Sequence, residues 1–373
     1  MFDILSSIII SFTITFLAIP VIIKVSEEKM LFDVPDARKI HSNPIPSLGG
    51  LGIFAGFVIT CLLTISFHNA TEFQFFIAAA LVIFFLGIKD DILIISPLKK
   101  FIGQVLAAFL IIFKGGVQIK GMHGFLGIYE LPEIFSLVLT YFTVIVIINS
   151  FNLIDGVDGL AGSLGFMATS IVGMYFLQND IIPYAALSFA LAGSLAAFLI
   201  YNFQPAKIFM GDTGSLLIGL ITSILIIKFI NVSTSSVVAL EASPALGFAI
   251  LLIPLIDTLR VFAIRIMHRR SPFSPDRNHV HHLLLDRGYS HQKITMILVS
   301  INLLFIALTY LGRSLGSTVL IFGIVSIFFA GIGLLYYNRP DRTLILADTG
   351  NKANKKVGSS TLLFSKKAVL EEK

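Results

Sequence analysis

The chain has 373 residues, of which 56% are hydrophobic and only 13% are charged, with a net charge of +5 and a mean hydropathy of +0.91. These values lie far outside the range of soluble domains and exclude an ordinary cytosolic enzyme. The composition predicts an all-α polytopic membrane protein that lies in a lipid bilayer, with no nucleic acid among its partners.

Apolar stretches that are long enough, or nearly so, to cross a hydrocarbon core of about 30 Å recur along the whole chain. Eleven of them lie near residues 4–23, 49–67, 73–88, 99–113, 134–150, 160–177, 182–201, 214–230, 244–266, 294–312 and 316–337. The first follows only three residues and lacks a basic n-region and a cleavage site, so we expect it to remain as an anchor. The single cysteine, Cys61, lies inside the second stretch, which excludes an internal disulfide.

Lysine and arginine are distributed unevenly between the connecting loops. The loops after stretches 1, 3, 5, 7 and 9 and the C-terminal tail hold nearly all of them, and only Lys114, Lys120, Lys228 and Arg313 fall on the other side. The positive-inside rule therefore predicts an external N-terminus and a cytoplasmic C-terminus. Residues 1–337 are expected to form one membrane domain. Residues 338–373 are expected to form a polar, basic and flexible cytoplasmic tail.

Polar sequences that are unusual for plain connectors occur at all five predicted cytoplasmic loops. They are DVPDARKIHSNPIPSLGG at 33–50, LGIKDDILIISPLKK at 86–100, NSFNLIDGVDGLAG at 149–162, NFQPAKIFMGDTGSLL at 202–217 and PDRNHVHHLLLDRG at 275–288. No predicted external loop has a comparable density of Asp, Asn, Gly and His. Because solvated connectors would not be confined to one face, this distribution predicts a functional site there.

Two of these sequences carry paired acidic residues. Asp90 and Asp91 lie at headgroup depth, either as a capped helix end with Lys89 as counter-charge or as carboxylates that serve a cation or a reacting phosphate. Asp155 and Asp158 are three residues apart and would share one face of a helix. A helix end followed by a new cap is the structural alternative for this second pair.

Two further sequences combine acidic and cationic chemistry. Asp212 in GDTGS either caps the next helix or supplies the hard oxygen that Mg²⁺ prefers, beside free N–H groups for a phosphate. Asp257 and Arg260 either form a structural ion pair, or Arg260 reaches a phosphate as a bidentate hydrogen-bond donor.

Three histidines, His279, His281 and His282, lie within four positions beside Arg277. Adjacent imidazoles do not converge on one zinc ion, and no cysteine completes a tetrahedral site. Among arginines they are better suited to donate hydrogen bonds to an anion, and diphosphate also explains the acidic sequences through a bridging Mg²⁺. Phosphoryl transfer to or from a lipid is therefore the predicted chemistry.

Six motifs in order resemble the polyprenyl-phosphate N-acetylhexosamine-1-phosphate transferase family, and within it the bacterial undecaprenyl-phosphate N-acetylglucosamine branch. They are DVPDARKIHSNPIPSLGG, the Asp90-Asp91 pair, NSFNLIDGVDGLAG, GDTGS, DTLRV and SPFSPDRNHVHH. The resemblance covers residues from about 33 to 287. It implies an enzyme of the bacterial inner membrane that transfers the sugar phosphate of a UDP-N-acetylhexosamine to undecaprenyl phosphate and releases UMP, at the first membrane step of cell-envelope polysaccharide synthesis.

The resemblance also implies roles for particular residues. Asp212 and Asn152 match ligands of Mg²⁺, with Mn²⁺ as an alternative ion, and Asp90 and Asp91 match an acidic pair used in catalysis. Substrate-binding roles fall on Asp155, Asp158, Lys100, Arg260, Arg277, His279, His281 and His282. Lys99 competes with Lys100 for the position of the basic residue. A homodimer remains open.

Three other interpretations of the sequence are weighed against this one. The nearest is the phospho-N-acetylmuramoyl-pentapeptide transferase of peptidoglycan synthesis, which shares the lipid acceptor, although the SPFSPDRNHVHH form favours the N-acetylglucosamine branch. A transporter would place its charges near the bilayer midplane in broken helices. A scaffold that recruits cytoplasmic partners would not need acidic, amide and imidazole groups together.

Overall fold

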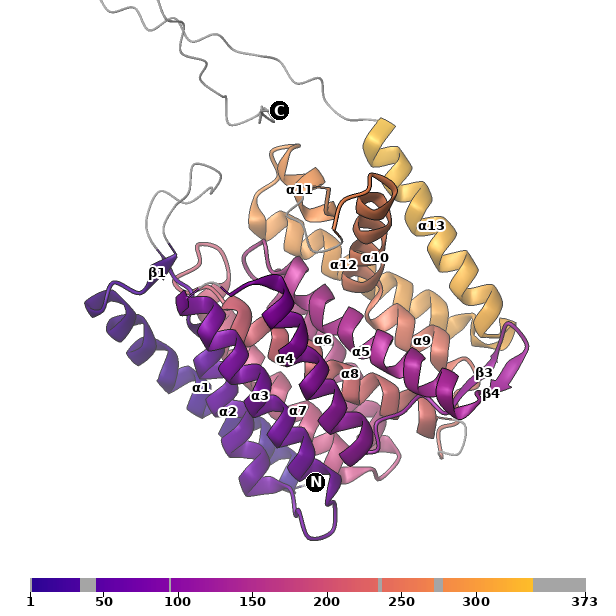
Figure 1. Ribbon diagram of the computed structural model, residues 1–373, viewed down its shortest axis with the longest axis horizontal. Helices are drawn as coiled ribbons and strands as arrows, with labels where there is room; N and C mark the ends of the chain where they lie inside the picture. Colours follow the sequence, from indigo (N-terminus) through magenta and orange to yellow (C-terminus); the bar gives the residue numbers. More distant parts are fainter. Residues whose placement is uncertain (1, 34–44, 94, 234–236, 272–277, 338–373) are drawn as a thin grey trace, which may run out of the picture.

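The computed structural model describes residues 2–33, 45–93, 95–233, 237–271 and 278–337, and these are mostly helical (Figure 1). The α-helices are α1 (Phe2–Glu28), α2 (Gly49–Thr64), α3 (Glu72–Leu93), α4 (Pro97–Phe109), α5 (Glu133–Ile154), α6 (Leu160–Gln178), α7 (Ile182–Asn202), α8 (Gly211–Val232), α9 (Ser243–Ile250), α10 (Leu252–Met267), α11 (Val280–Leu285), α12 (His291–Leu311) and α13 (Ser317–Tyr337). A π-helical turn, η1 (Leu110–Lys114), extends α4, and a 3₁₀ turn, η2 (Arg313–Leu315), precedes α13.

Two short antiparallel ribbons complete the secondary structure of the described residues. β1 (Phe32–Asp33) pairs with β2 (Ile45–Pro46), and β3 (Gly121–Phe125) pairs with β4 (Ile128–Glu130). The first ribbon leads into α2, and the second separates η1 from α5. Both ribbons lie at the ends of the helices rather than among them (Figure 1).

Each of the eleven predicted apolar stretches falls on helix, so the all-α membrane class is confirmed. By length and composition, seven helices within the described ranges could cross a membrane, namely α1, α5, α6, α7, α8, α12 and α13. The α9–α10 pair would add an eighth span if it is counted as one, and α2 is apolar but has only 16 residues. The count of eleven crossings and the orientation of the termini stay predictions.

Helices α7 and α8 form the centre of the bundle. In each of these two helices, 78% of the most apolar 18-residue segment is buried, against 17% in α1 and 22% in α13. Helix α8 packs against α2, α3, α5 and α6, and α7 packs against α1, α2 and α6. Gly87 allows α3 to lie close to α8. A Cβ atom at this position would lie only 2.4 Å from the Cα atom of Thr213, so a larger residue would push the helices apart. The start of α8 is thus held inside the bundle.

Helix α13 connects the two ends of the molecule. At its beginning, the Thr318 hydroxyl accepts a hydrogen bond of 2.8 Å from the N–H of Leu126 in the β3–β4 turn. At its other end, the Arg287 guanidinium, just after α11, donates to the carbonyl of Leu335. The N-terminus and the β3–β4 ribbon lie toward one end of the bundle, and β1 and α11 lie toward the other (Figure 1).

The chain bends by 80° between α9 and α10. A break in a helix leaves backbone groups without their partners, which is costly away from water. Asn302 of α12 supplies the missing partners: its Oδ1 accepts from the N–H of Ile253 at 3.0 Å, and its Nδ2 donates to the carbonyls of Ala249 and Ile250, both at 3.1 Å. One fully buried amide therefore stabilises the bend.

Candidate active site

Asp91 holds the first turn of α8. One carboxylate oxygen accepts the backbone N–H of Asp212 at 2.6 Å, and the other accepts the N–H and the hydroxyl of Thr213 at 3.1 and 2.6 Å. These N–H groups would otherwise lack partners, and a carboxylate also suits the positive end of the helix dipole. Gly211 permits the approach, because its φ is +71° and a Cβ atom there would lie 2.7 Å from the same carboxylate. Asp91 thus fixes where Asp212 sits.

Replacing Asp91 by Ala is expected to lower the free energy of unfolding by about 1–3 kcal/mol, because three hydrogen bonds at a partly buried helix start lose their acceptor. Thermal unfolding in detergent would measure the change. Asp90→Asn is the matched control, since Asp90 accepts only one backbone N–H, that of Ile95 at 2.7 Å. Equal stability of the two variants would contradict this role for Asp91.

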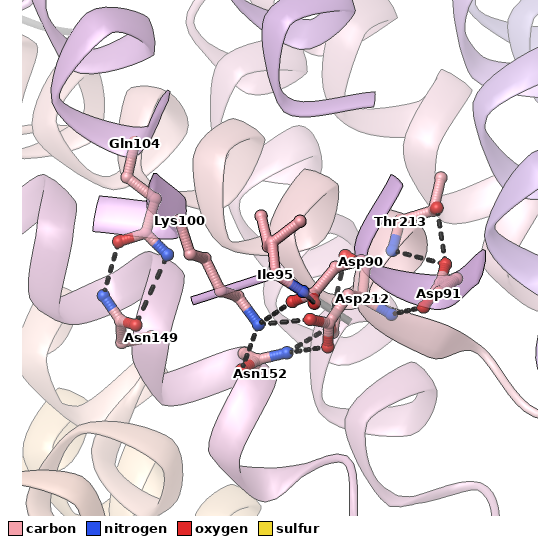
Figure 2. A network of polar contacts seen from close by, with 10 residues as sticks. Asp90, Asp91, Ile95, Lys100, Gln104, Asn149, Asn152, Asp212 and Thr213 are labelled. Atoms are coloured by element: carbon pink, nitrogen blue, oxygen red, sulfur yellow. Dashed lines mark hydrogen bonds and ion pairs between the residues drawn. The ribbon is translucent and has the colours of Figure 1, made fainter. Parts of the chain in front are cut away.

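Lys100 lies at the centre of the polar network (Figure 2). Its ammonium is 3.2 Å from Oδ2 of Asp90 and 3.2 Å from Oδ1 of Asn152, and it also contacts Oδ2 of Asp212. Residues from α3, α4, α5 and α8 therefore meet at one point. Of the two lysines that the sequence left as alternatives, Lys99 is exposed and Lys100 lies in the network.

The amides of α5 order this network. Asn152 donates from Nδ2 to Oδ1 of Asp212 at 2.6 Å and to the hydroxyl of Ser215 at 3.1 Å, which leaves its Oδ1 facing Lys100. One turn earlier, Asn149 and Gln104 exchange two amide hydrogen bonds of 2.9 and 3.4 Å (Figure 2). The paired amides fix α4 against α5 and thereby fix the position from which Lys100 extends.

The loop between α5 and α6 places Asp155 beside the network. Burial raises the pKa of the Asp155 carboxyl well above its usual range, and the negative charges of Asp212, Asp91 and Asp158 raise it further. The site therefore gathers several acidic groups around the ammonium of Lys100. A bound cation would favour the ionised form of carboxyl groups whose mutual repulsion raises the pKa.

Asp158, three residues after Asp155, contacts other elements of the fold. Its carboxylate is 3.1 Å from Nδ1 of His291 at the start of α12, and its carbonyl accepts the Thr295 hydroxyl at 2.9 Å. The following N–H, that of Gly159, donates to Oδ1 of Asn202 at 2.8 Å. These contacts attach the loop to α7 and α12. Because α5 ends at Ile154, Asp155 and Asp158 do not lie on one helix face, as their i, i+3 spacing would have placed them on a helix.

A second cluster forms between α10 and the start of α11. Asp257 is fully buried and accepts from the Arg260 guanidinium at 2.8 Å, from Nδ1 of His279 at 2.9 Å and from the N–H of Val280 at 3.1 and 3.2 Å. Arg260 also donates to the carbonyl of Asn278. The predicted ion pair of Asp257 and Arg260 is confirmed, and it includes a histidine.

His281 brings the two clusters together. Its ring stacks on that of His279, with centroids 5.6 Å apart, and the His282 ring lies 4.3 Å away. A Cβ atom at Gly156 would lie only 2.8 Å from Nε2 of His281, so this ring faces the α5–α6 loop. Burial lowers the pKa of His281 well below its usual range, and the neighbouring histidines lower it further. This environment favours the neutral form of the His281 ring.

The α5–α6 loop thus links the two clusters, because Asp155 is close enough to Asp91 and Asp212 for their charges to raise its pKa, and Gly156 lies against the ring of His281. Arg277 lies outside the described residues, as do the acidic and basic residues of 34–44. Sequence reasoning missed Gln104, Asn202 and His291. The sequence did contain a signal for Gln104 and His291, because a polar residue within an apolar stretch, or just before one, is expected to face the interior of the bundle. In the structure both side chains are buried.

Comparisons with known proteins identify the family of the chain. Residues 73–230 match the family described as glycosyl transferase family 4. A probable undecaprenyl-phosphate N-acetylglucosaminyl 1-phosphate transferase of Bacillus subtilis (strain 168) is 31% identical over 309 residues, which cover 80% of this chain and 83% of that protein.

Two further relatives have related names. A decaprenyl-phosphate N-acetylglucosaminephosphotransferase of Mycobacterium leprae (strain TN) is 34% identical over 71% of this chain and 72% of its own length. An undecaprenyl-phosphate alpha-N-acetylglucosaminyl 1-phosphate transferase of Yersinia pestis is 31% identical over 79% of each chain. The chain therefore belongs to glycosyl transferase family 4, among the polyprenyl-phosphate N-acetylhexosamine-1-phosphate transferases that its motifs resemble.

Proposed function

We propose that the protein transfers N-acetylglucosamine 1-phosphate, or a related N-acetylhexosamine 1-phosphate, from a UDP-sugar to undecaprenyl phosphate and releases UMP. The observation that carries the proposal is the meeting of Asp90, Lys100, Asn152 and Asp212 at one point, at one end of an apolar helix bundle. The names of the relatives support undecaprenyl phosphate as the acceptor and N-acetylglucosamine 1-phosphate as the transferred group. The muramoyl-pentapeptide alternative is not favoured, since these relatives are named for N-acetylglucosamine.

In this reaction an oxygen of the lipid phosphate attacks the phosphorus that carries the sugar, and the bond between the two phosphates of the UDP-sugar breaks. Negative charge grows on the departing UMP and on the transferred group, so the protein must neutralise charge and align two anions. Lys100 supplies a fixed positive charge between the carboxylates. Asp90 is suited to orient the lipid phosphate or to take its proton. The histidines and Arg260 are proposed to face the diphosphate and the sugar.

The oxygen donors of the site fit Mg²⁺, or Mn²⁺ in its place. Asp212 and Asn152 present a carboxylate and an amide oxygen, which are hard ligands, and Asp90 adds a second carboxylate nearby. Within the described ranges, no three His, Cys, Asp or Glu side chains form a metal site by themselves. This suits Mg²⁺, which usually combines one or two carboxylates with substrate phosphates. When bound, the ion would stabilise negative charge on the phosphates.

The proposal includes a membrane orientation. The site would face the cytoplasm of a bacterial cell, where UDP-sugars are made, with the N-terminus outside and the basic tail inside. The distribution of lysine and arginine supports this orientation. The protein's immediate partners would then be the bilayer, the polyprenyl phosphate and the UDP-sugar.

Purified protein supplied with UDP-N-acetylglucosamine, undecaprenyl phosphate and Mg²⁺ is expected to release UMP in a 1:1 ratio with the lipid-linked sugar. Separate reactions with UDP-N-acetylgalactosamine and UDP-N-acetylmuramoyl-pentapeptide would identify the sugar. The control omits the lipid phosphate and should yield no UMP. Folded protein that releases no UMP with any of these substrates would contradict the proposal, and transport of an intact UDP-sugar into vesicles would favour a transporter.

A further inference from the structure

The fully buried carboxylate of Asp257 accepts hydrogen bonds from two groups that can only donate, and it also contacts a ring nitrogen of His279. Arg260 and the N–H of Val280 cannot accept hydrogen bonds, and an ionised carboxylate cannot donate. The hydrogen bond of 2.9 Å to Nδ1 of His279 therefore requires a proton on that nitrogen. Asp257 thus dictates the tautomer of the ring as well as its orientation.

The other nitrogen of His279 is left for a ligand. His279 is only 3% exposed, and its Nε2 is buried with no hydrogen-bond partner among the described residues. Nearly all buried polar groups in folded proteins have a partner, so an unpaired imidazole nitrogen indicates a group that arrives with a substrate. Nδ1 of the adjacent His281 is also buried without such a partner. The two rings are stacked, and that of His281 lies against Gly156 of the α5–α6 loop.

We propose that Asp257 is a positioning residue that acts through His279, fixing the ring so that its Nε2 meets the diphosphate and sugar end of the UDP-sugar. This inference rests on the proposed function. When neutral, Nε2 accepts a hydrogen bond from a sugar hydroxyl or amide; when protonated, it donates to a phosphate oxygen, with Asp257 balancing the charge. Arg260 serves the same arrangement, because it holds both the carboxylate of Asp257 and the carbonyl of Asn278, directly before the histidine.

Asp257→Asn tests the inference with little change of volume. An amide has one acceptor and one donor group, and its NH₂ is disfavoured at the position of Oδ1, which accepts from both Arg260 and the N–H of Val280. The NH₂ would therefore face Nδ1 of His279 and force the proton onto Nε2. Loss of the group that orients a metal-ligating histidine costs about 10- to 100-fold in activity, and we expect a loss of similar size in kcat/KM for the UDP-sugar when His279 loses its orienting carboxylate. The KM for undecaprenyl phosphate should not change.

A double-mutant cycle with His279→Ala separates a positioning role from a merely structural one. If Asp257 acts through His279, Asp257→Asn will cause no further loss of kcat/KM in the His279→Ala background. If the double variant instead loses kcat/KM by the product of the two single losses, the inference is overturned. Asp180→Asn, in the turn between α6 and α7 and outside the site, serves as the matched carboxylate control.

His279→Asn keeps the inference testable if Asp257→Asn fails to fold. The amide of Asn can take the place of Nδ1 and still donate to Asp257, but it has nothing at the position of Nε2. We therefore expect His279→Asn to unfold at the wild-type temperature and to be as inactive as His279→Ala. Wild-type activity in this variant would overturn the inference, whereas a wild-type protein that releases no UMP would overturn the proposed function itself.

Discussion

Asp212→Asn is expected to reduce UMP release on the order of 1,000-fold or more, because the proposed metal ligand loses its charge while several kcal/mol of transition-state stabilisation depend on it. The fold should survive. The amide keeps an oxygen for Lys100 or Asn152, and the first turn of α8 is held through its backbone by Asp91. Initial rates across a range of Mg²⁺ concentrations, together with thermal unfolding, would measure both effects.

The matched control for this variant is Asp180→Asn, which removes an equal charge from the turn between α6 and α7. Its turnover should equal that of the wild type. Turnover near the wild-type rate in Asp212→Asn at any Mg²⁺ concentration would remove this residue as a metal ligand. A fall in unfolding temperature equal to that of Asp91→Ala would show that its role is structural.

Lys100→Met is expected to lower turnover about 100-fold or more, since it removes a fixed positive charge from the site of phosphoryl transfer. It should also lower the unfolding temperature in EDTA, because Asp90 and Asp212 then face each other without the ammonium between them. Mg²⁺ offers a substitute charge to the same oxygens. Its addition should therefore raise the unfolding temperature of this variant more than that of the wild type.

The neighbouring Lys99 provides the control for this second prediction. Lys99→Met removes an equal charge from an exposed position in the same turn of α4, and it should change neither turnover nor the response to Mg²⁺. An equal Mg²⁺ response in Lys100→Met and wild-type protein would contradict the view that ammonium and metal are drawn to the same carboxylates.

Most of the fold followed from hydropathy because a lipid environment leaves few alternatives. Every apolar stretch became helix, including the two shortest, which correspond to α3 and to α4 with η1. The bend between α9 and α10 was not predicted, because residues 244–266 were treated as a single spanning stretch in spite of Asp257 and Arg260 within it. It depends on Asn302, some fifty residues away, and a sequence pattern carries no record of such a long-range partner.

The site was predicted as a set of residues but not as a set of roles. Composition and loop position marked Asp90 and Asp91 together, yet the structure directs one toward Lys100 and the other toward the start of α8. Successive side chains on a helix point about 100° apart, so neighbours in sequence rarely share a partner. The split between Asp155 and Asp158 has a different origin, because the helix that their spacing assumed ends at Ile154.

The amide of Asn302 has an influence well beyond its own contacts. By satisfying the backbone at the bend, it lets α10 leave the direction of α9 and carry Asp257 and Arg260 to the histidines. A shorter or apolar side chain at position 302 would leave the backbone groups at the bend without partners and would favour a smaller angle between α9 and α10. Because Asp257 and Arg260 lie on α10, a change in this angle would move both residues away from the histidines. A residue far from the reacting groups, such as Asn302, should thus tolerate substitution poorly when its side chain determines the direction of a helix that carries site residues.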